Sequence, residues 1–202
     1  MAAERPRDAW PFGSIGEKGA FLSHLAVLRE ARDDDLRTVL ILEDDAQFAG
    51  DFLANWSAVN EEVRAGYWDL LHLGHLRVLG TTIPTTTPGA RLERLEPSAG
   101  LLGAHCYAVQ GRCLDPLIKH FERQSGGVRG DDLYGPMPSD GTLSTFARTN
   151  PQVKRYVVIP SLCRQRSSRS DISPRLFDRV PVVRQASRMW RVMKNRRPGV
   201  GA

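Results

Sequence analysis

The sequence has few cysteines and no long apolar run. Its 202 residues include three cysteines, Cys106, Cys113 and Cys163, none of them in a C-x-x-C pair. This number and spacing indicate reduced, buried thiols rather than a disulfide framework. No apolar run approaches the roughly 18–20 residues that cross a bilayer, and residues 1–13 lack the apolar stretch of a secretory signal. We therefore expect a soluble, intracellular globular protein.

Several sequence signatures of enzymes are also missing. The chain contains no G-x-S-x-G, P-loop or G-x-G-x-x-G motif, which leaves serine hydrolase, P-loop NTPase and dinucleotide-binding functions without support. The histidines His72, His75 and His105 do not have the spacing of zinc ligands. We assign no zinc site.

What is present is a globular composition with an uneven distribution of charge. Hydrophobic residues make up 41% of the chain and charged residues 25%, which fits one compact domain. Residues 1–153 contain 15 basic and 21 acidic residues, whereas residues 154–202 contain 13 basic and 2 acidic residues. A basic end on an acidic body suggests a polyanionic neighbour, and a solvated tail is the alternative.

The order of patterns predicts an α/β fold. Ser14 and Glu17 have the spacing of a capping box, and Phe21, Leu25 and Leu28 then recur at helical spacing to about residue 32. Residues 38–42 are a continuous apolar run that predicts a strand buried on both faces. Further elements are expected as a helix from Asp51 to Gly66, strands at 68–74 and 104–109, a helix around 114–121, a loop at 125–139, a helix at 140–148 and a strand at 156–159. Alternating strands and helices indicate a mostly parallel sheet.

An acidic triplet follows the first apolar strand directly. Ligands of open α/β sheets bind beyond the carboxyl ends of the strands, which places Glu43, Asp44 and Asp45 at the mouth of a site. Alternate strand residues share a side, so Glu43 and Asp45 project together and Asp44 faces away. Two carboxylates suit Mg²⁺ or Mn²⁺. The alternative is a solvated acidic turn.

Two other polar residues have both a structural and a functional interpretation. His24 follows Ser23 in a helix whose first turns contain Gly16 and Gly19, which suggests close approach of a ligand or backbone. A buried histidine bonded to a backbone carbonyl is the alternative. Asp140 is either a helix N-cap or a loop carboxylate that acts as a general base.

The ordered motifs closely resemble glycosyltransferase family 25. The resemblance lies in G-x-x-G-x-x-x-S-H at 16–24, L-I-L-E-D-D at 40–45, D-L-L-H-L-G at 69–74, G-A-H-C-Y at 103–107, P-S-D at 138–140 and a closing segment around 160–172. It implies a GT-A-like fold with an open, mostly parallel sheet flanked by helices. One departure is expected: the family's first strand, of the V-I-N-L type, does not precede residue 16.

The resemblance also implies an activity and a set of site residues. It implies a hexosyltransferase that uses a UDP-sugar, with galactose the expected hexose, and Mn²⁺ or Mg²⁺ held by Glu43 and Asp45. The donor site would include Glu43, Asp44, Asp45, His24 and Ser23; Tyr107 and His105 would contact the acceptor, and Asp140 would be the base. A truncated, non-catalytic family member that binds saccharide or a partner protein is the alternative.

The resemblance divides the chain into a lead at 1–13, a family 25-like domain at 14–173 and a basic tail at 174–202. The tail combines arginines with apolar residues and one tryptophan, Trp190, which fits docking on an anionic membrane surface. The expected acceptor is a saccharide or lipid-linked saccharide in lipopolysaccharide or another surface polysaccharide, and the expected location is cytoplasmic, on the inner face of the membrane. Nucleic-acid binding is not expected, because aromatic residues are not interleaved with the charges.

Overall fold

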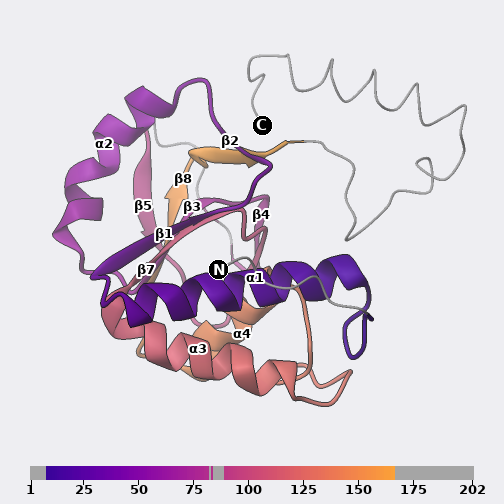
Figure 1. Cartoon of the computed structure of the whole chain (residues 1–202). Coiled ribbons are helices and arrows are strands. Elements are labelled where there is room, and N and C mark those ends of the chain that lie inside the picture. The colour runs from indigo at the N-terminus through magenta and orange to yellow at the C-terminus, as the bar shows by residue number, and fades with distance from the viewer. Residues whose placement is uncertain (1–7, 82, 84–88, 167–202) are drawn as a thin grey trace, which may run out of the picture.

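A central sheet with helices on both faces organises the chain (Figure 1). The computed structural model describes residues 8–81, 83 and 89–166. The helices are α1 (Ile15–Asp33), α2 (Phe52–Ala65), α3 (Gly111–Ser125) and α4 (Ser139–Thr149). The strands are β1 (Thr38–Leu42), β2 (Ala46–Phe48), β3 (Leu70–Gly74), β4 (Arg77–Leu79), β5 (Arg91–Arg94), β6 (Gly100–Leu102), β7 (Cys106–Gln110), β8 (Arg155–Ile159) and β9 (Cys163–Gln165).

The helix ends follow signals in the sequence. The Ser14 hydroxyl oxygen accepts a hydrogen bond from the Glu17 backbone N–H at 3.1 Å, which confirms the predicted start of α1. Gly66 ends α2 in the left-handed region at φ 66°, where glycine has no steric cost. Asp51 is the N-cap residue of α2, but its side chain makes no capping hydrogen bond.

The main sheet is mixed. Its strand order is β1-β7-β3-β8-β5, and β9 lies beside β3 and pairs with β2. Strands β1, β3 and β8 share one direction, whereas β7 and β5 run against their neighbours. Strand β7 begins beside Gly74, where β3 ends, so it must run back along β3. The α/β class with an open sheet flanked by helices is confirmed, but the expected predominance of parallel pairing gives way to mixed pairing.

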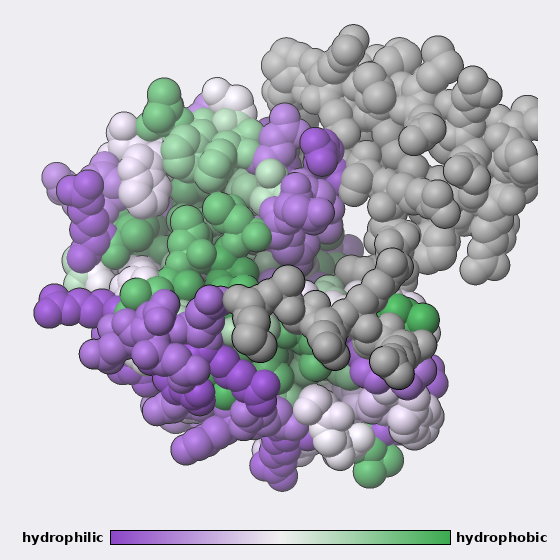
Figure 2. Space-filling model, in the orientation of Figure 1, coloured by the Kyte–Doolittle hydropathy of each residue, from purple (hydrophilic) through white to green (hydrophobic). Residues whose placement is uncertain are grey.

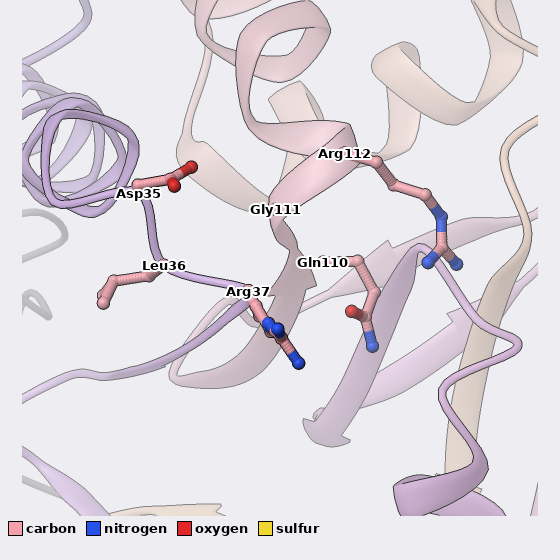
Figure 3. A pocket seen from close by; sticks show the side chains of 6 residues that line it. All are labelled: Asp35, Leu36, Arg37, Gln110, Gly111 and Arg112. Atoms are coloured by element: carbon pink, nitrogen blue, oxygen red, sulfur yellow. The ribbon is translucent and has the colours of Figure 1, made fainter.

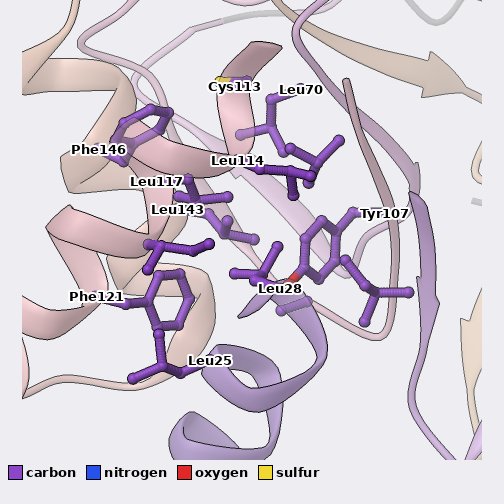
Figure 4. Packing of buried hydrophobic residues seen from close by; sticks show 14 of the residues in the cluster. Leu25, Leu28, Leu70, Tyr107, Cys113, Leu114, Leu117, Phe121, Leu143 and Phe146 are labelled. Carbon is purple, nitrogen blue, oxygen red and sulfur yellow. The ribbon is translucent and has the colours of Figure 1, made fainter. Parts of the chain in front are cut away.

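Helices α1, α3 and α4 cover one face of the sheet (Figure 1). The predicted apolar face of α3 is buried there, with Leu114, Leu117 and Phe121 packed against α1 and the sheet (Figure 4). Ile118 belongs to the same buried cluster. Helix α2 covers the opposite face, where Val59 packs in a second cluster with Trp68 and strand residues such as Leu71. Strand β3 is buried along its whole length because helices lie on both of its sides.

Strand β1 departs from the prediction that both of its faces are buried. Val39 and Ile41 pack toward α1, but the side chains of Leu40 and Leu42 are 51% and 46% exposed. Strand β1 lies at the end of the strand order, beyond the reach of α2, so one face stays open.

The membrane-related predictions can be compared with the structure only in part. No helix in the described part of the chain combines the length and apolarity needed to span a bilayer. The expected membrane-docking tail at 174–202 and the end of the family-like closing segment, at 167–172, lie outside the described residues.

Candidate active site

The acidic motif is fixed at the carboxyl end of β1 by backbone hydrogen bonds. The Glu43 N–H donates to the His105 carbonyl at 3.0 Å, which extends the β1–β7 ladder one residue beyond Leu42. The chain then turns, with the Ala46 N–H donating to the Glu43 carbonyl at 3.0 Å and the Arg166 N–H to the Asp45 carbonyl at 2.8 Å. Strand pairing on both sides therefore gives the motif a defined position.

Glu43 is held by a chain of buried side chains. Its Oε1 lies 3.3 Å from His24 Nε2, and His24 Nδ1 lies 2.8 Å from the Tyr107 hydroxyl. A carboxylate can only accept, so His24 Nε2 carries the proton toward Glu43 and Nδ1 accepts from Tyr107. Burial, followed by the nearby Glu43 charge, raises the pKa of Tyr107, which keeps this hydroxyl protonated. Glu43 thereby sets the tautomer of His24, and the Tyr107 hydroxyl pairs with the other ring nitrogen.

Asp45 lies beside Glu43 and has an unused oxygen. Burial, followed by the charge of Glu43, raises the pKa of Asp45, while a hydrogen bond from Gln165 opposes this shift. Gln165 Nε2 also lies 3.5 Å from Glu43 Oε2, so one amide contacts both carboxylates. Asp45 Oδ1 is buried and has no hydrogen-bond partner among the described residues. Such an oxygen beside a second carboxylate fits a bound divalent cation.

The sides taken by the triplet agree with the predicted alternation. Glu43 and Asp45 are partly buried, and Asp44 is exposed. In the described part of the chain, no three or more histidine, cysteine, aspartate or glutamate side chains gather as a metal site. A cation here would therefore take two protein carboxylates and complete its coordination with water or substrate oxygens.

Of the other expected contact residues, Tyr107 and His105 are buried and Ser23 is exposed. Tyr107 and His105 are each 0% exposed, so neither presents a surface to an acceptor. His105 instead lies with its Nε2 3.0 Å from the Cys163 carbonyl oxygen, which ties β7 to β9. Ser23 is exposed on α1, and its hydroxyl donates to the Gly19 carbonyl at 2.9 Å.

Asp140 belongs to the same end of the sheet. It lies in the first turn of α4, where Oδ2 accepts from the Gly103 N–H at 2.9 Å and Oδ1 from the Gly141 N–H at 2.8 Å. Gly103 lies two residues before His105, whose carbonyl oxygen accepts from the Glu43 N–H. Burial raises the pKa of Glu17, and the charge of Asp140 adds to this rise. Glu17 lies seven residues before His24 on α1, or about 10 Å along the helix. The structure thus brings Asp140 toward the acidic motif without a direct contact.

Gln165 is the site residue that sequence reasoning missed. It is the last residue of the Pro160-x-x-x-x-Gln165 match in the closing segment, to which the resemblance assigned no role. Only the pairing of β9 with β2, with Gln165 opposite Ala46, brings the amide to the acidic motif.

A cavity of about 490 Å³ lies at the other end of β1 (Figure 3). Its lining combines the turn after α1 with the start of α3, through Asp35, Leu36, Arg37, Gln110, Gly111 and Arg112. The Arg112 side chain is bound to Asp69, with Nε donating to Oδ1 at 2.7 Å. The cavity shares no residue with the acidic site.

Known proteins resemble part of this chain. A sequence model of glycosyltransferase family 25 (LPS biosynthesis protein) matches residues 13–81. The chain is 38% identical over 65 residues to a probable inactive glycosyltransferase 25 family member 3 from Bos taurus, and equally so to the inactive member 3 from Homo sapiens. It is 34% identical over 65 residues to procollagen galactosyltransferase 2 from Mus musculus.

These matches are local. Each covers 31% of this chain, 11% of the two inactive relatives and 10% of the mouse galactosyltransferase. The matched residues 13–81 include α1 with His24, strand β1 and the whole acidic motif. The resemblance to glycosyltransferase family 25 that the motifs indicated is therefore confirmed over residues 13–81.

Proposed function

We propose that the chain is a divalent-cation-dependent glycosyltransferase that moves a hexose from a UDP-sugar to a saccharide acceptor. The observation that carries this proposal is the Glu43–Asp45 pair at the end of β1, held by His24 and Gln165 and including a buried, unpartnered Asp45 oxygen. This pair lies inside the segment that matches the family. Galactose is the first choice of hexose, because one relative is named a galactosyltransferase.

Glu43 and Asp45 would hold Mn²⁺ or Mg²⁺, which offsets the negative charge that develops on the leaving nucleoside diphosphate. The chain's own residues prepare this site. Gln165 contacts both carboxylates, and His24 donates to Glu43 from the side of α1. Both carboxylates are thus oriented before a ligand arrives, which lowers the reorganisation that binding requires.

In the transfer, an acceptor hydroxyl bonds to the anomeric carbon, the bond from that carbon to the diphosphate oxygen breaks, and the hydroxyl proton leaves. Asp140 is the proposed base for this proton. The N–H groups of Gly103 and Gly141 fix its carboxylate. Tyr107 and His105 support the site from the core. Asp44 and Ser23, which are exposed, remain proposed donor contacts.

The pathway is a further part of the proposal. The description of the matched family names lipopolysaccharide biosynthesis, which supports a saccharide or lipid-linked saccharide acceptor. Such an acceptor suits a cytoplasmic enzyme on the inner face of a membrane, with the basic residues 174–202 as the docking segment.

A second candidate is a non-catalytic family member that binds saccharide or a partner protein. Two of the matched relatives are named inactive, which favours this alternative. The two candidates differ in turnover, whereas both retain the fold.

The test is turnover of UDP-galactose with Mn²⁺ by the full chain and by Asp45→Asn. Loss of one of the two carboxylates should lower turnover by more than about 100-fold, while the exposed Asp51→Asn, whose side chain caps nothing, should match the parent. Asp45→Asn turnover within twofold of the parent would contradict the cation site. A folded parent that turns over no UDP-sugar would support the non-catalytic candidate.

A further inference from the structure

Strand β1 has a free backbone edge in the described part of the chain. Its partner there is β7 on one side. The Gly111 N–H donates to the Arg37 carbonyl, and the Glu43 N–H donates to β7, so the odd-numbered residues of this segment direct their backbone groups to β7. Backbone groups of alternate residues point to opposite sides of a strand. Those of Thr38, Leu40 and Leu42 therefore point away from the sheet.

The same edge is apolar and unprotected. Leu40 pairs with Ala108, and Leu42 with Cys106, on the face that α2 covers farther in. The apolar core surface thus continues outward onto two exposed leucines, and Figure 2 shows apolar surface over the region of β1 between α1 and α2. Protected edge strands carry lysine, proline or a bulge. The five residues of β1, Thr-Val-Leu-Ile-Leu, have no charge and no proline.

Opposite charges flank β1 at matching distances from Leu40. Arg37 lies three residues before Leu40 and Glu43 three residues after it. In an antiparallel pair of two identical strands centred on Leu40, Arg37 of each copy is directly opposite Glu43 of the other. Both are odd-numbered, so both side chains lie on the α1 face. In this register Thr38 faces Leu42 and Leu40 faces Leu40, so each exchanges both backbone hydrogen bonds with the residue opposite.

We propose that two copies of this chain associate through antiparallel pairing of their β1 strands, centred on Leu40. The contact is isologous, because the same surface serves both copies. It joins the two sheets into one, covers Leu40 in both copies and brings Arg37 of each copy beside Glu43 in the acidic motif of the other. The positively charged Arg37 guanidinium of one copy thereby lies beside the acidic site of the other. The inference does not depend on the proposed activity.

The test is analytical ultracentrifugation of the full chain over a concentration series. We expect a particle with twice the mass of one chain. Leu40→Lys places two like charges opposite each other at the centre of the interface, and it should weaken the dimer by at least about tenfold. Val128→Lys is the matched control: Val128 is 78% exposed and lies in the loop after α3. Its dimer should match the parent's.

The charge pair tests the register separately. Arg37→Glu should weaken the dimer because two acidic side chains then face each other, and adding Glu43→Arg should restore it because opposite charges face again. A parent chain that stays monomeric at every concentration would overturn the proposal. The edge of β1 would then be covered by another segment of the chain or by another protein. A dimer that survives Leu40→Lys would overturn the interface, and an exchange that fails to restore the dimer would overturn the register.

Discussion

Tyr107 is connected to the acidic motif through His24. Its hydroxyl donates to His24 Nδ1 at 2.8 Å and leaves the other ring nitrogen to donate to Glu43. Tyr107 thus orients the ring of His24, and His24 in turn orients the proposed metal ligand Glu43. The resemblance implied that Tyr107 contacts the acceptor. Its burial and its bond to His24 instead describe a positioning residue.

Tyr107→Phe should weaken Mn²⁺ binding by roughly 10- to 100-fold, because His24 loses the hydroxyl that holds its ring in place against Glu43. The unpartnered Nδ1 should also cost about 1–2 kcal/mol of stability. Calorimetric titration with Mn²⁺ and thermal unfolding measure the two effects. Tyr67→Phe is the control, since it removes only an exposed hydroxyl bond to Glu62. Equal Mn²⁺ affinity in Tyr107→Phe and the parent would remove the positioning role.

His120 should make the fold sensitive to mild acid. Burial, followed by Arg123, lowers the pKa of His120 to about 4, and its Nε2 lies 3.0 Å from Thr145 Oγ1. The unfolded chain, with a histidine pKa near 6.5, takes up this proton first as the pH falls. The contribution of neutral His120 is therefore complete above about pH 6.5 and is lost progressively toward pH 4.

The measurement is the melting temperature at pH 7 and pH 5 for the parent and His120→Gln, which replaces the ring by a group that does not titrate. The drop between the two pH values should be smaller in the variant. His75, whose burial also lowers its pKa to about 4, should leave part of the drop in place. An unchanged drop in His120→Gln would show that His120 does not contribute to acid sensitivity.

At the scale of elements, Gly74 lets three strands meet beside the acidic motif. It pairs with Cys106 of β7 and with Cys163 of β9. A Cβ at this position would lie 2.7 Å from His105 Nε2 and 2.9 Å from the Cβ atoms of both cysteines. The absence of a side chain is what permits β9, and with it Gln165, to approach.

Gly74→Ala should lower the free energy of unfolding by about 1–3 kcal/mol, the usual cost of overpacking a core. Gly50→Ala should change it by less than about 0.5 kcal/mol, because no atom of the described residues lies within 4 Å of a Cβ at Gly50. Urea unfolding of both variants makes the comparison. A Gly74→Ala chain as stable as Gly50→Ala would contradict the close packing of these strands.

The sequence predicted the long elements better than the short ones. Helices α1, α2, α3 and α4 and strands β3, β7 and β8 have strong periodicity or apolar runs, and each appears close to its expected place. Strands β2, β4, β5, β6 and β9 have three or four residues each, too few for a period to be recognised. They form because neighbouring strands, which are distant in sequence, supply their hydrogen-bond partners. Local sequence patterns do not contain this pairing.

Burial was the property that local patterns predicted least well. Strand β1 has the composition of a strand covered on both faces, yet its edge position exposes Leu40 and Leu42. Arg155 shows the reverse: it counts toward the basic end of the sequence but is 1% exposed, and its guanidinium donates to His72 and to the Ala99 carbonyl. Both outcomes depend on long-range packing.

In the whole molecule, residues from inside and outside the family-matched segment meet at one end of the sheet. Helix α1 and the acidic motif lie within the matched residues 13–81. The later residues Gly103, Asp140 and Gln165 complete the surroundings of that motif. The matched segment covers about a tenth of the length of the curated relatives. We therefore propose donor binding for this chain on the basis of its own residues.

Calorimetric titration of the folded chain with UDP, with and without Mn²⁺, measures this binding. We expect saturable binding with Mn²⁺ present and binding at least about tenfold weaker without it, because the cation joins the diphosphate to Glu43 and Asp45. Lack of UDP binding by the folded chain under both conditions would contradict the proposed donor site.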